Sequence, residues 1–460
     1  MTEMMQQIRE LLDAKQIDQL KQVVNQYSAH EVAEILSAMG TDGQWEDVVI
    51  IFRLLNKNLS LEVFELLALD MQEKLIQSFS DERANELIEN MEPDDRAKML
   101  DELPAKVTKR LLNIMTQEER NKTSTLLGHE AQTAGRIMTP EYVSLKAEMT
   151  QEQALERIRV QRKRAETIYV LYVTDANRKL MGVLSLGELV TADRNCKVAD
   201  IMNENIIKVH THTDQEEVAR LLQDRDLLAV PVVDSEERLV GIVTVDDAMD
   251  VLEEEATEDM FKKVGIGAVL YKKEESRSSK LVFGSLFHVW KVRLPFLVIT
   301  LIGGMLAGGV IDAFESTLEA VVALAIFIPV IMDMGGNVGT QSSTIFTRAF
   351  VLGQINVNRF LRHFAREVGI GASIGALLGI TAGLIALIWQ GLPELSYTVG
   401  LALFCTITLA SALGFLTPYV LIRLGLDQAA GSDPIITTVK DITALFIYFG
   451  LANFFLSALL

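Results

Sequence analysis

The charged residues of this 460-residue chain are concentrated in its first half, and this segregation restricts the fold more than any other feature. Apolar stretches of about 20 residues are long enough to cross a bilayer as helices. Five such stretches occur, near residues 294–314, 317–349, 368–390, 396–422 and 434–459. From Leu294 onward the only Lys and Arg residues are Arg348, Arg359, Arg362, Arg366, Arg423 and Lys440. The sequence therefore predicts a mainly α-helical membrane protein, with a soluble half followed by a five-helix transmembrane domain at 286–460.

The balance of charge indicates the kind of partner. With 62 acidic and 43 basic residues, the chain carries a net charge of −19. This acidity argues against nucleic acid, whose phosphates require a basic surface, and favours cations. The two cysteines, Cys196 and Cys405, lie in different halves of the chain, so we expect neither a disulfide framework nor a thiolate metal cage.

Basic residues beside the apolar spans indicate their orientation. Lys291 and Arg293 precede the first span, residues 348–366 after the second span contain four arginines, and Arg423 follows the fourth span. The alternate loops contain no Lys or Arg. By the positive-inside rule, the soluble half is expected in the cytoplasm and the C-terminus outside. The N-terminus also lacks an apolar core of signal-peptide length, which agrees with this orientation.

Glycines at regular spacing predict close packing in the membrane. The third span carries Gly371, Gly375, Gly379 and Gly383 at four-residue intervals. Small residues at this spacing let helices approach closely, so we expect a tightly packed bundle or dimer.

Residues 1–132 predict a helical solenoid. Apolar residues recur at three- and four-residue spacing, and similar helix starts with acidic first turns occur near residues 80, 93 and 116. The second of these starts carries the acidic triplet Glu92, Asp94 and Asp95. The triplet either complements the helix dipole, which would explain all three starts, or faces a divalent ion.

Residues 133–198 and 199–252 contain the same βαββα pattern twice, which indicates an internal duplication. They resemble a tandem pair of CBS domains, an α/β regulatory module that usually binds adenine nucleotides or metal ions. The family's Ser/Thr-x-x-Asp ribose-binding motif is matched by Thr244 and Asp247. The first copy departs from this motif with Ser185 and Glu188. The resemblance thus implies that a nucleotide such as ATP would bind through the second copy.

An acidic segment follows the second copy. Residues 245–259, VDDAMDVLEEEATED, contain eight carboxylates and no basic residue. As a helix, the segment places Asp247, Asp250, Glu254 and Glu258 along one stripe, where like charges oppose packing against another acidic surface. A divalent cation would reverse that effect. We predict an ion-bridged connecting helix and linker over residues 253–285, and the alternative is a solvated acidic linker.

Polar residues within two of the apolar spans are candidates for ion conduction. Asp441 lies inside the last span, and a carboxylate at membrane depth usually lines an ion or proton path. The alternative is an Asp near the cytoplasmic end that pairs with Lys440 or reaches water. Asp333 and Asn337 lie in the segment PVIMDMGGNVGTQSST of the second span, where polar groups suit a water-filled path. For Asn337, a helix-capping role is equally compatible with the sequence.

These features together resemble the MgtE family of magnesium channels over essentially the whole chain. The resemblance rests on the helical domain, the CBS pair, the acidic connecting (plug) helix, and the segments PVIMDMGGNVGTQSST and DPIITTVKD. It implies a homodimer in the bacterial inner membrane, surrounded by lipid, with a Mg²⁺ pore at the dimer axis. The family's pore aspartate matches Asp441, and carbonyls near Thr437 would complete an outer shell for hydrated Mg²⁺. Asp433 departs from the family, which often has Asn or a small residue there, and adds possible charge to the pore.

The family pattern also implies feedback control. Cytosolic Mg²⁺ would bridge acidic residues of the soluble domains and the connecting helix into a compact closed state, and carboxylate repulsion would open the pore when Mg²⁺ is scarce. The matching positions are Asp94, Asp95, Asp214, Glu216, Asp226, Asp247, Asp250, Glu255, Glu258, Asp259 and Asp427.

Three other functions are compatible with parts of the sequence. A transporter for another divalent ion, Co²⁺ or Mn²⁺, is the nearest, although only His210 and His212 among the six histidines lie close together. A CBS-regulated membrane enzyme is a second, but the chain has neither a zinc-protease nor a P-loop motif, so we do not expect an enzyme. A membrane-anchored sensor without transport is the third, and the polar residues in two spans argue against it.

Overall fold

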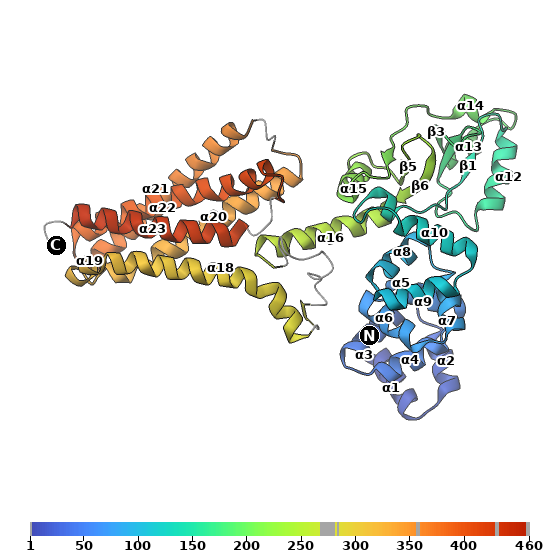
Figure 1. The fold of residues 1–460 in the computed structure, drawn as a ribbon, viewed down its shortest axis with the longest axis horizontal. Coiled ribbons are helices and arrows are strands. Elements are labelled where there is room, and N and C mark those ends of the chain that lie inside the picture. The colour runs from blue at the N-terminus through green and yellow to red at the C-terminus, as the bar shows by residue number, and fades with distance from the viewer. Residues whose placement is uncertain (1, 267–280, 283–284, 356–358, 428–431, 457–460) are drawn as a thin grey trace. The chain divides into compact units, whose positions relative to one another are not determined.

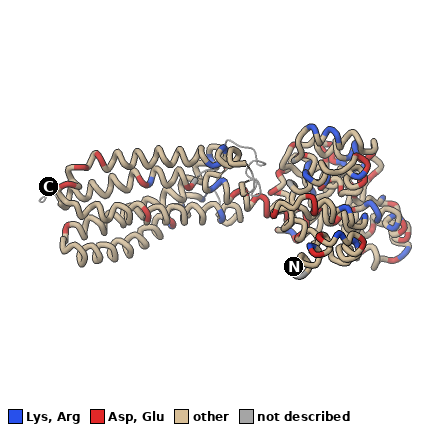
Figure 2. The backbone as a smooth tube through the Cα atoms, turned by 90° about the horizontal axis from the view of Figure 1, so that it is seen from below, with Lys and Arg blue, Asp and Glu red and all other residues tan. Residues whose placement is uncertain are grey.

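The computed structural model describes residues 2–266, 281–282, 285–355, 359–427 and 432–456 (Figure 1). The chain forms two compact units, Met1–Glu253 and Glu254–Leu460. Figure 2 shows that Lys, Arg, Asp and Glu are dense in the first unit and sparse along the long helices of the second. The predicted segregation of charge therefore corresponds to a division into structural units.

The N-terminal part of the first unit consists of short helices, as predicted. Its start signals behave as expected in two cases: the Ser80 hydroxyl accepts a hydrogen bond from the Arg83 amide, and Pro93 occupies the first turn of its helix. The rings of Phe52, Phe64 and Phe79 meet in the core. The helices are α1 (Thr2–Asp13), α2 (Ile17–Val24), α3 (Ala29–Thr41), α4 (Trp45–Leu54), α5 (Lys57–Leu66), α6 (Leu69–Ser78), α7 (Asp81–Ile88), α8 (Pro93–Glu102), α9 (Ala105–Ile114) and α10 (Gln117–Leu127).

The rest of the first unit contains two three-stranded sheets, ordered β1-β2-β3 and β4-β5-β6. In each sheet the first pair is parallel and the second antiparallel, and the register shifts at matching points, Val173/Thr174 and Val232/Val233. This correspondence confirms the predicted duplication. The elements are α11 (Ala134–Ile137), β1 (Ser144–Leu145), α12 (Gln151–Gln161), β2 (Val170–Thr174), β3 (Leu180–Ser185), α13 (Leu186–Thr191), α14 (Val198–Ile201), β4 (Val209–His210), α15 (Gln215–Asp224), β5 (Ala229–Val233) and β6 (Leu239–Thr244).

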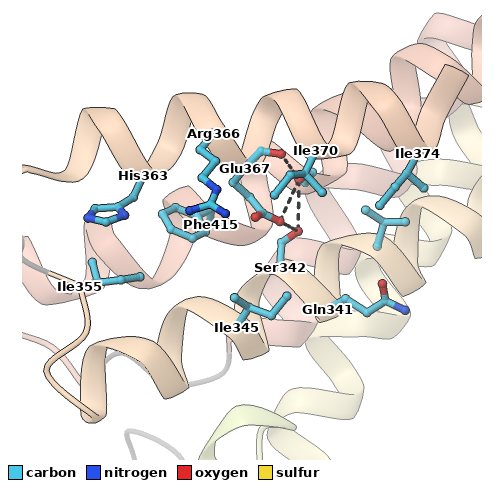
Figure 3. A pocket seen from close by; sticks show the side chains of 12 residues that line it. Gln341, Ser342, Ile345, Ile355, His363, Arg366, Glu367, Ile370, Ile374 and Phe415 are labelled. Atoms are coloured by element: carbon cyan, nitrogen blue, oxygen red, sulfur yellow. Dashed lines mark hydrogen bonds between the residues drawn. The ribbon is translucent and has the colours of Figure 1, made fainter.

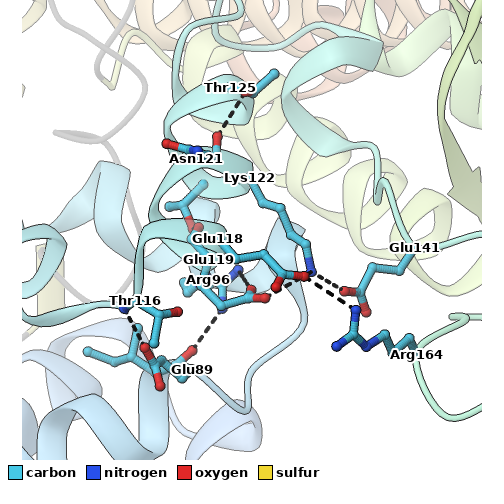
Figure 4. Close-up of polar contacts among 12 residues, drawn as sticks. Glu89, Arg96, Thr116, Glu118, Glu119, Asn121, Lys122, Thr125, Glu141 and Arg164 are labelled. Atoms are coloured by element: carbon cyan, nitrogen blue, oxygen red, sulfur yellow. Dashed lines mark hydrogen bonds and ion pairs between the residues drawn. The ribbon is translucent and has the colours of Figure 1, made fainter.

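A network of ion pairs joins the helical part to the first sheet domain (Figure 4). Lys122 on α10 lies 2.8 Å from Glu119 and 2.8 Å from Glu141, which follows α11. Glu119 in turn pairs at 2.7 Å with Arg96 of α8, whose side chain is fully buried. Each buried charge in this network has a partner of opposite sign, which is the condition under which buried ions are tolerated.

The second unit is built from long helices. They are α18 (Leu286–Ala313), the short α19 (Glu315–Ala320), α20 (Leu324–Val351), α21 (Phe360–Gln390), α22 (Pro393–Arg423) and α23 (Ser432–Phe455). Within the described residues, four helical segments are long and apolar enough to cross a membrane: α18, α21, α22 and residues 433–455 of α23. The polar segment from Asp333 to Thr344 lowers the hydropathy of α20, so the fifth predicted span stays a prediction.

The connecting helix differs from its predicted bounds. Helix α16 runs from Val245 to Lys263, so it contains the whole acidic segment 245–259 that was considered as a helix, and the domain boundary predicted at residue 253 falls inside it. Residues 267–280 and 283–284 of the predicted connecting helix and linker lie outside the described residues.

The glycine stripe packs α21 against α22 within one chain. A side chain at Gly375 would place its Cβ 2.9 Å from the main-chain oxygen of Phe404, and one at Gly371 would collide with Ser411. Gly379 and Gly383 face Gly400 and Ser396 in the same way. The stripe therefore has the close-packing function that its spacing predicted.

Candidate conduction and metal-sensing sites

Acidic residues from distant parts of the first unit meet where α8 packs on the start of α16. Ala97 of α8 belongs to the same buried apolar cluster as Ala248 and Val251 of α16. Lys98 of α8 lies 3.8 Å from Asp250 of α16, so the first turns of the two helices lie near one another, and both are acidic: Asp94 and Asp95 on α8, Asp246 and Asp247 on α16. We call the group formed by Glu65, Glu92, Asp94, Asp95, Glu166, Asp246, Asp247 and Asp250 the acidic interface.

Burial and mutual repulsion raise the pKa of the carboxyl groups in this interface. Asp94 is only 6% exposed, and burial, followed by the charges of Asp247 and Asp95, holds its pKa well above the usual range. Burial raises the pKa of Asp247 to about 7, opposed by the hydrogen bond from Thr244 and assisted by neighbouring acids. The same causes raise the pKa of Glu65 and of Glu166 to about 8. The interface therefore brings together more negative charge than its surroundings neutralise.

The carboxylate oxygens of the acidic interface are the kind of ligand that a hard divalent cation prefers. One oxygen of Asp94, Oδ1, is buried without a hydrogen-bond partner in the described part of the chain. No three His, Cys, Asp or Glu side chains among the described residues converge closely enough to hold a bare ion. Mg²⁺ fits this arrangement because it keeps several of its water molecules and is bound through one or two carboxylates rather than by a closed protein cage.

The structure brings some predicted sensor residues together and leaves others apart. Asp94, Asp95, Asp247 and Asp250 belong to the acidic interface, and Lys98 lies 3.8 Å from Asp250. The remaining sensor candidates of the first unit have local roles instead: Asp214 caps α15 by accepting a hydrogen bond from the Glu216 amide, Glu216 pairs with Arg220, and Asp226 has a positive φ of 52° after that helix.

Two members of the acidic interface were missed by the sequence analysis. Glu65 lies on α5 and Glu166 lies in the loop before β2, and neither belongs to a motif, a charge run or a helix start. Both become visible only through their neighbours in space, since the charges of Glu92 and Asp95 act on each of them. No local signal in the sequence identifies them.

The predicted ribose-binding pair also faces this region. The Thr244 hydroxyl donates a hydrogen bond of 2.5 Å to Asp247 Oδ2. Asp247 is thus shared between the nucleotide motif and the acidic interface. In the first copy, Ser185 and Glu188 form a helix-capping box instead, in which each side chain bonds the other residue's main chain.

Near its C-terminal end, α16 carries a lysine that pairs with two carboxylates of the second unit. Lys262 Nζ lies 2.6 Å from Glu258 and 2.5 Å from Asp427, which follows α22. These two carboxylates belong to the predicted sensor set, as do Glu255 and Asp259 on the same half of α16. A positive charge therefore lies between two predicted metal ligands, and its pKa is raised by their hydrogen bonds and charges, which outweigh the effect of burial.

The pore candidate Asp441 pairs with its neighbour in the chain. Lys440 Nζ lies 2.6 Å from Asp441 Oδ1 and donates a hydrogen bond of 2.6 Å to the main-chain oxygen of Met332 on α20. The Lys440 side chain is 3% exposed and that of Asp441 is 19% exposed. The ion pair proposed as the alternative for Asp441 is therefore present, while its carboxylate keeps a solvent-accessible side.

The glycines of α20 make room for this arrangement. A Cβ at Gly335 would lie 3.0 Å from the Lys440 side chain, and one at Gly336 would lie 2.9 Å from its Nζ. One turn further on, Gly339 packs against Ile436 of α23. The Gly-Gly-Asn sequence of α20 thus allows α23, and with it Asp441, to approach closely.

The other pore candidates lie on the same two helices. Asn337 donates a hydrogen bond of 3.1 Å to Asp333 one turn earlier on α20, and both side chains are exposed within the single chain. Because α20 is continuous from Leu324 to Val351, Asn337 lies in the helix interior and caps no helix end. Asp433 and Thr437 lie in the first two turns of α23 and are partly buried.

Three known protein families match parts of the chain. The family described as a divalent cation transporter matches residues 328–451, the MgtE intracellular N domain matches residues 31–132, and the CBS domain matches residues 134–195 and 198–254. Similar curated proteins include three named magnesium transporter MgtE. The chain is 42% identical to that of Thermus thermophilus over 354 residues, 76% of each chain. It is 39% identical to that of Enterococcus faecalis over 339 residues, 74% of this chain and 72% of the relative.

Bacillus subtilis provides the third of these relatives, with 35% identity over 378 residues, 82% of this chain and 81% of the relative. Two solved structures resemble the first unit, both with a TM-score of 0.50. The soluble part of a magnesium transporter is 32% identical and covers 55% of this chain and 99% of its own. The cytosolic domain of the Mg²⁺ channel MgtE in complex with ATP is 38% identical and covers 53% of this chain and 98% of its own.

Proposed function

The chain belongs to the MgtE family, and from this membership we propose that it is a Mg²⁺-selective channel or transporter for Mg²⁺ uptake. It would act as a homodimer in the bacterial inner membrane, with the first unit in the cytoplasm and the C-terminus outside. Five helices per chain would cross the bilayer, because α20, with 28 residues, is about 42 Å long and exceeds the roughly 30 Å hydrocarbon core. Its polar residues suit a helix beside a water-filled path.

In the proposed pore, Asp441 attracts hydrated Mg²⁺. The buried Lys440 holds this carboxylate from the protein side, because its ammonium is itself fixed by the Met332 carbonyl. The exposed side of Asp441 stays available to an ion that keeps its water shell. Two such carboxylates across a dimer axis, with oxygens near Thr437, would form the selective ring. Asp433, Asp333 and Asn337 would contribute further polar groups along the same helices.

The acidic interface supports the proposed gating. Its raised pKa values indicate that a fully ionised interface opposes the packing of α8 on α16. The carboxylates of Asp94, Asp95, Asp247 and Asp250 would share hydrated Mg²⁺ in the closed state, which removes the repulsion. Since the ion binds the compact arrangement better, it shifts the population toward that state. Low cytosolic Mg²⁺ would release the interface and open the pore.

The remaining predicted sensor residues would act near the membrane unit. Glu255, Glu258 and Asp259 on α16, together with Asp427, would form a second group of Mg²⁺ ligands, and Lys262 already neutralises part of their charge. Asp214, Glu216 and Asp226 remain sensor candidates on the basis of the family pattern alone. ATP would bind at the CBS pair through Thr244 and Asp247, as the ATP complex of a relative's cytosolic domain suggests.

The single observation that carries the transport proposal is the similarity of the chain to three proteins named magnesium transporter MgtE, with 35% to 42% identity over 74% to 82% of this chain. The test is Mg²⁺ flux into proteoliposomes containing the purified full-length protein, with zero or millimolar Mg²⁺ on the side of the soluble unit. We expect flux at zero Mg²⁺ and suppression at millimolar Mg²⁺. Mg²⁺ flux that does not change with the Mg²⁺ concentration on that side would support the proposed pore and refute the proposed gating. Flux of Co²⁺ or Mn²⁺ without Mg²⁺ flux would favour the alternative substrate.

A further inference from the structure

A cavity in the membrane unit is lined by a buried carboxylate without an ionic partner in the described residues. The cavity has a volume of about 300 Å³ and lies between α20, α21 and α22 (Figure 3). Glu367 of α21 lines it and is only 8% exposed. Within the described residues no Lys, Arg or His lies within ion-pair distance of this carboxylate, although an isolated charge is costly to bury. A cationic group that entered the cavity could therefore pair with this carboxylate.

One carboxylate oxygen of Glu367, Oε1, takes part in hydrogen bonds, and the other, Oε2, is available to a ligand in the cavity. The Ser342 hydroxyl donates to Glu367 Oε1 at 2.6 Å, and the Ser411 hydroxyl lies 3.2 Å from the same atom and 3.1 Å from the Glu367 main-chain oxygen. No hydrogen bond in the described structure reaches Oε2. The two serines come from α20 and α22, so three helices fix the carboxylate in place.

Basic side chains line the same cavity toward the start of α21. Arg366 and His363 line the same cavity, on the side toward the N-terminus of the helix, while Gln341 and Ile374 lie on the other side of Glu367 (Figure 3). Ile345, Ile370 and Phe415 provide most of the remaining wall. The cavity is therefore lined by basic groups at one end, by a carboxylate near its middle and by apolar side chains elsewhere. A ligand that complements this lining has an anionic group, a cationic group and apolar chains.

The depth of the cavity fits the level of lipid headgroups. Helix α21 has 31 residues and is about 46 Å long, which exceeds the roughly 30 Å hydrocarbon core by about 16 Å. The excess lies at the N-terminal end, where Arg359, Arg362, His363 and Arg366 occur within two turns. Glu367 follows directly, so the cavity lies where the headgroups meet the acyl chains.

From these observations we propose that the cavity binds a zwitterionic phospholipid with an ethanolamine headgroup. The primary ammonium donates hydrogen bonds to Glu367, the phosphate pairs with Arg366, and the acyl chains leave along Ile370 and Ile374. A single dehydrated metal ion does not fill about 300 Å³, since one water molecule occupies only about 30 Å³. A choline headgroup would satisfy the charge of Glu367 but has no N–H group to donate.

The test compares lipids that differ only in the headgroup. Full-length protein is delipidated in detergent, mixed with dioleoyl phosphatidylethanolamine, phosphatidylcholine or phosphatidylglycerol, and bound lipid is counted by native mass spectrometry. We expect the ethanolamine lipid to bind about tenfold more tightly than the choline lipid, the effect of one charge-assisted hydrogen bond. Glycerophosphoethanolamine, which lacks acyl chains, should bind much more weakly. If it bound as well as the lipid, the proposed lipid occupant would be wrong.

Two variants test the assignment of the charges. E367Q should abolish the preference for ethanolamine over choline, whereas R366Q should weaken binding of both lipids by a similar factor. R362Q is the matched control, because Arg362 lies one turn earlier on α21 and does not line the cavity. Equal binding of the two lipids to the unmodified protein would overturn the proposal, and so would an ethanolamine preference that survives in E367Q. These measurements do not depend on Mg²⁺ flux, so they can fail while the transport proposal stands.

Discussion

Replacing Asp247 by Asn should stabilise the contact between α8 and α16 in metal-free buffer, in a pH-dependent way. Burial and neighbouring acids raise the pKa of Asp247 from 3.8 to about 7. At about 1.36 kcal/mol for each pKa unit, a fully ionised Asp247 costs the closed interface at most about 4 kcal/mol. Asn removes this charge and still accepts the hydrogen bond from Thr244, which keeps the local geometry.

The sign of the pH dependence follows from the direction of the shift. Because the pKa is higher in the closed state than in the open state, the closed state binds more protons between about pH 4 and pH 7. The contact therefore loses stability as the pH rises through this range, and the loss is complete above pH 7. The difference between D247N and the unmodified protein should be small near pH 5 and largest near pH 8.

Amide hydrogen exchange provides the measurement, since it reports local opening rather than unfolding of the whole protein. Opening relieves only part of the repulsion, so we expect exchange of amides in α8 and the first turn of α16 to slow about 10- to 100-fold in D247N at pH 8. Glu217→Gln, an exposed change on α15, is the matched control. Millimolar Mg²⁺ should protect the unmodified protein and have little further effect on D247N. Equal exchange in the two proteins at pH 8 without metal would refute the reasoning.

Three further predictions follow from the second unit. D441A should abolish Mg²⁺ flux while Mg²⁺-dependent protection of the soluble unit persists; retained flux would remove Asp441 from the pore. K262M deletes the charge between Glu258 and Asp427, so proteolysis after α16 should become faster without metal, and millimolar Mg²⁺ should cancel the difference; equal cleavage of the two proteins without metal would contradict this role. G375V would place its Cβ 2.9 Å from the Phe404 carbonyl and should prevent assembly of α21 with α22, whereas G304A meets nothing within 4 Å and should be tolerated in thermal unfolding; assembly of G375V as stable as that of G304A would refute the packing argument.

The architecture was predictable because it depends on patterns along the chain. The length of the apolar stretches predicted the long helices, and the repeated βαββα pattern predicted two matching sheets. A boundary was less accurate where a pattern gave no stop signal: the predicted domain boundary at residue 253 falls inside α16, which continues from Val245 to Lys263. Helix α20 is difficult to recognise as a membrane span, because the polar residues that suggest a functional role also lower its hydropathy.

The candidate sites were only partly predictable, because contacts between distant residues decide them. Asp94 and Asp247 were recognised from acidic helix starts, but the sequence does not show that they lie close enough for the charge of Asp247 to act on Asp94. Glu65 and Glu166 had no signal at all. Glu367 was overlooked for a similar reason: its importance depends on serines from two other helices and on the missing counter-charge, neither of which is visible along the chain.

The contact between the helical and sheet parts of the first unit has two kinds of charge arrangement, and this difference constrains how it can open. On one side, Lys122 neutralises Glu119 and Glu141, so this part of the contact needs no metal ion to offset its charge. On the other side, Asp94, Asp95 and Asp247 repel one another. Loss of Mg²⁺ would therefore separate α8 from α16 first and leave the Lys122 network as a hinge. We expect a rotation of the helical part rather than its complete release, so K122M should convert the rotation into full separation in metal-free buffer.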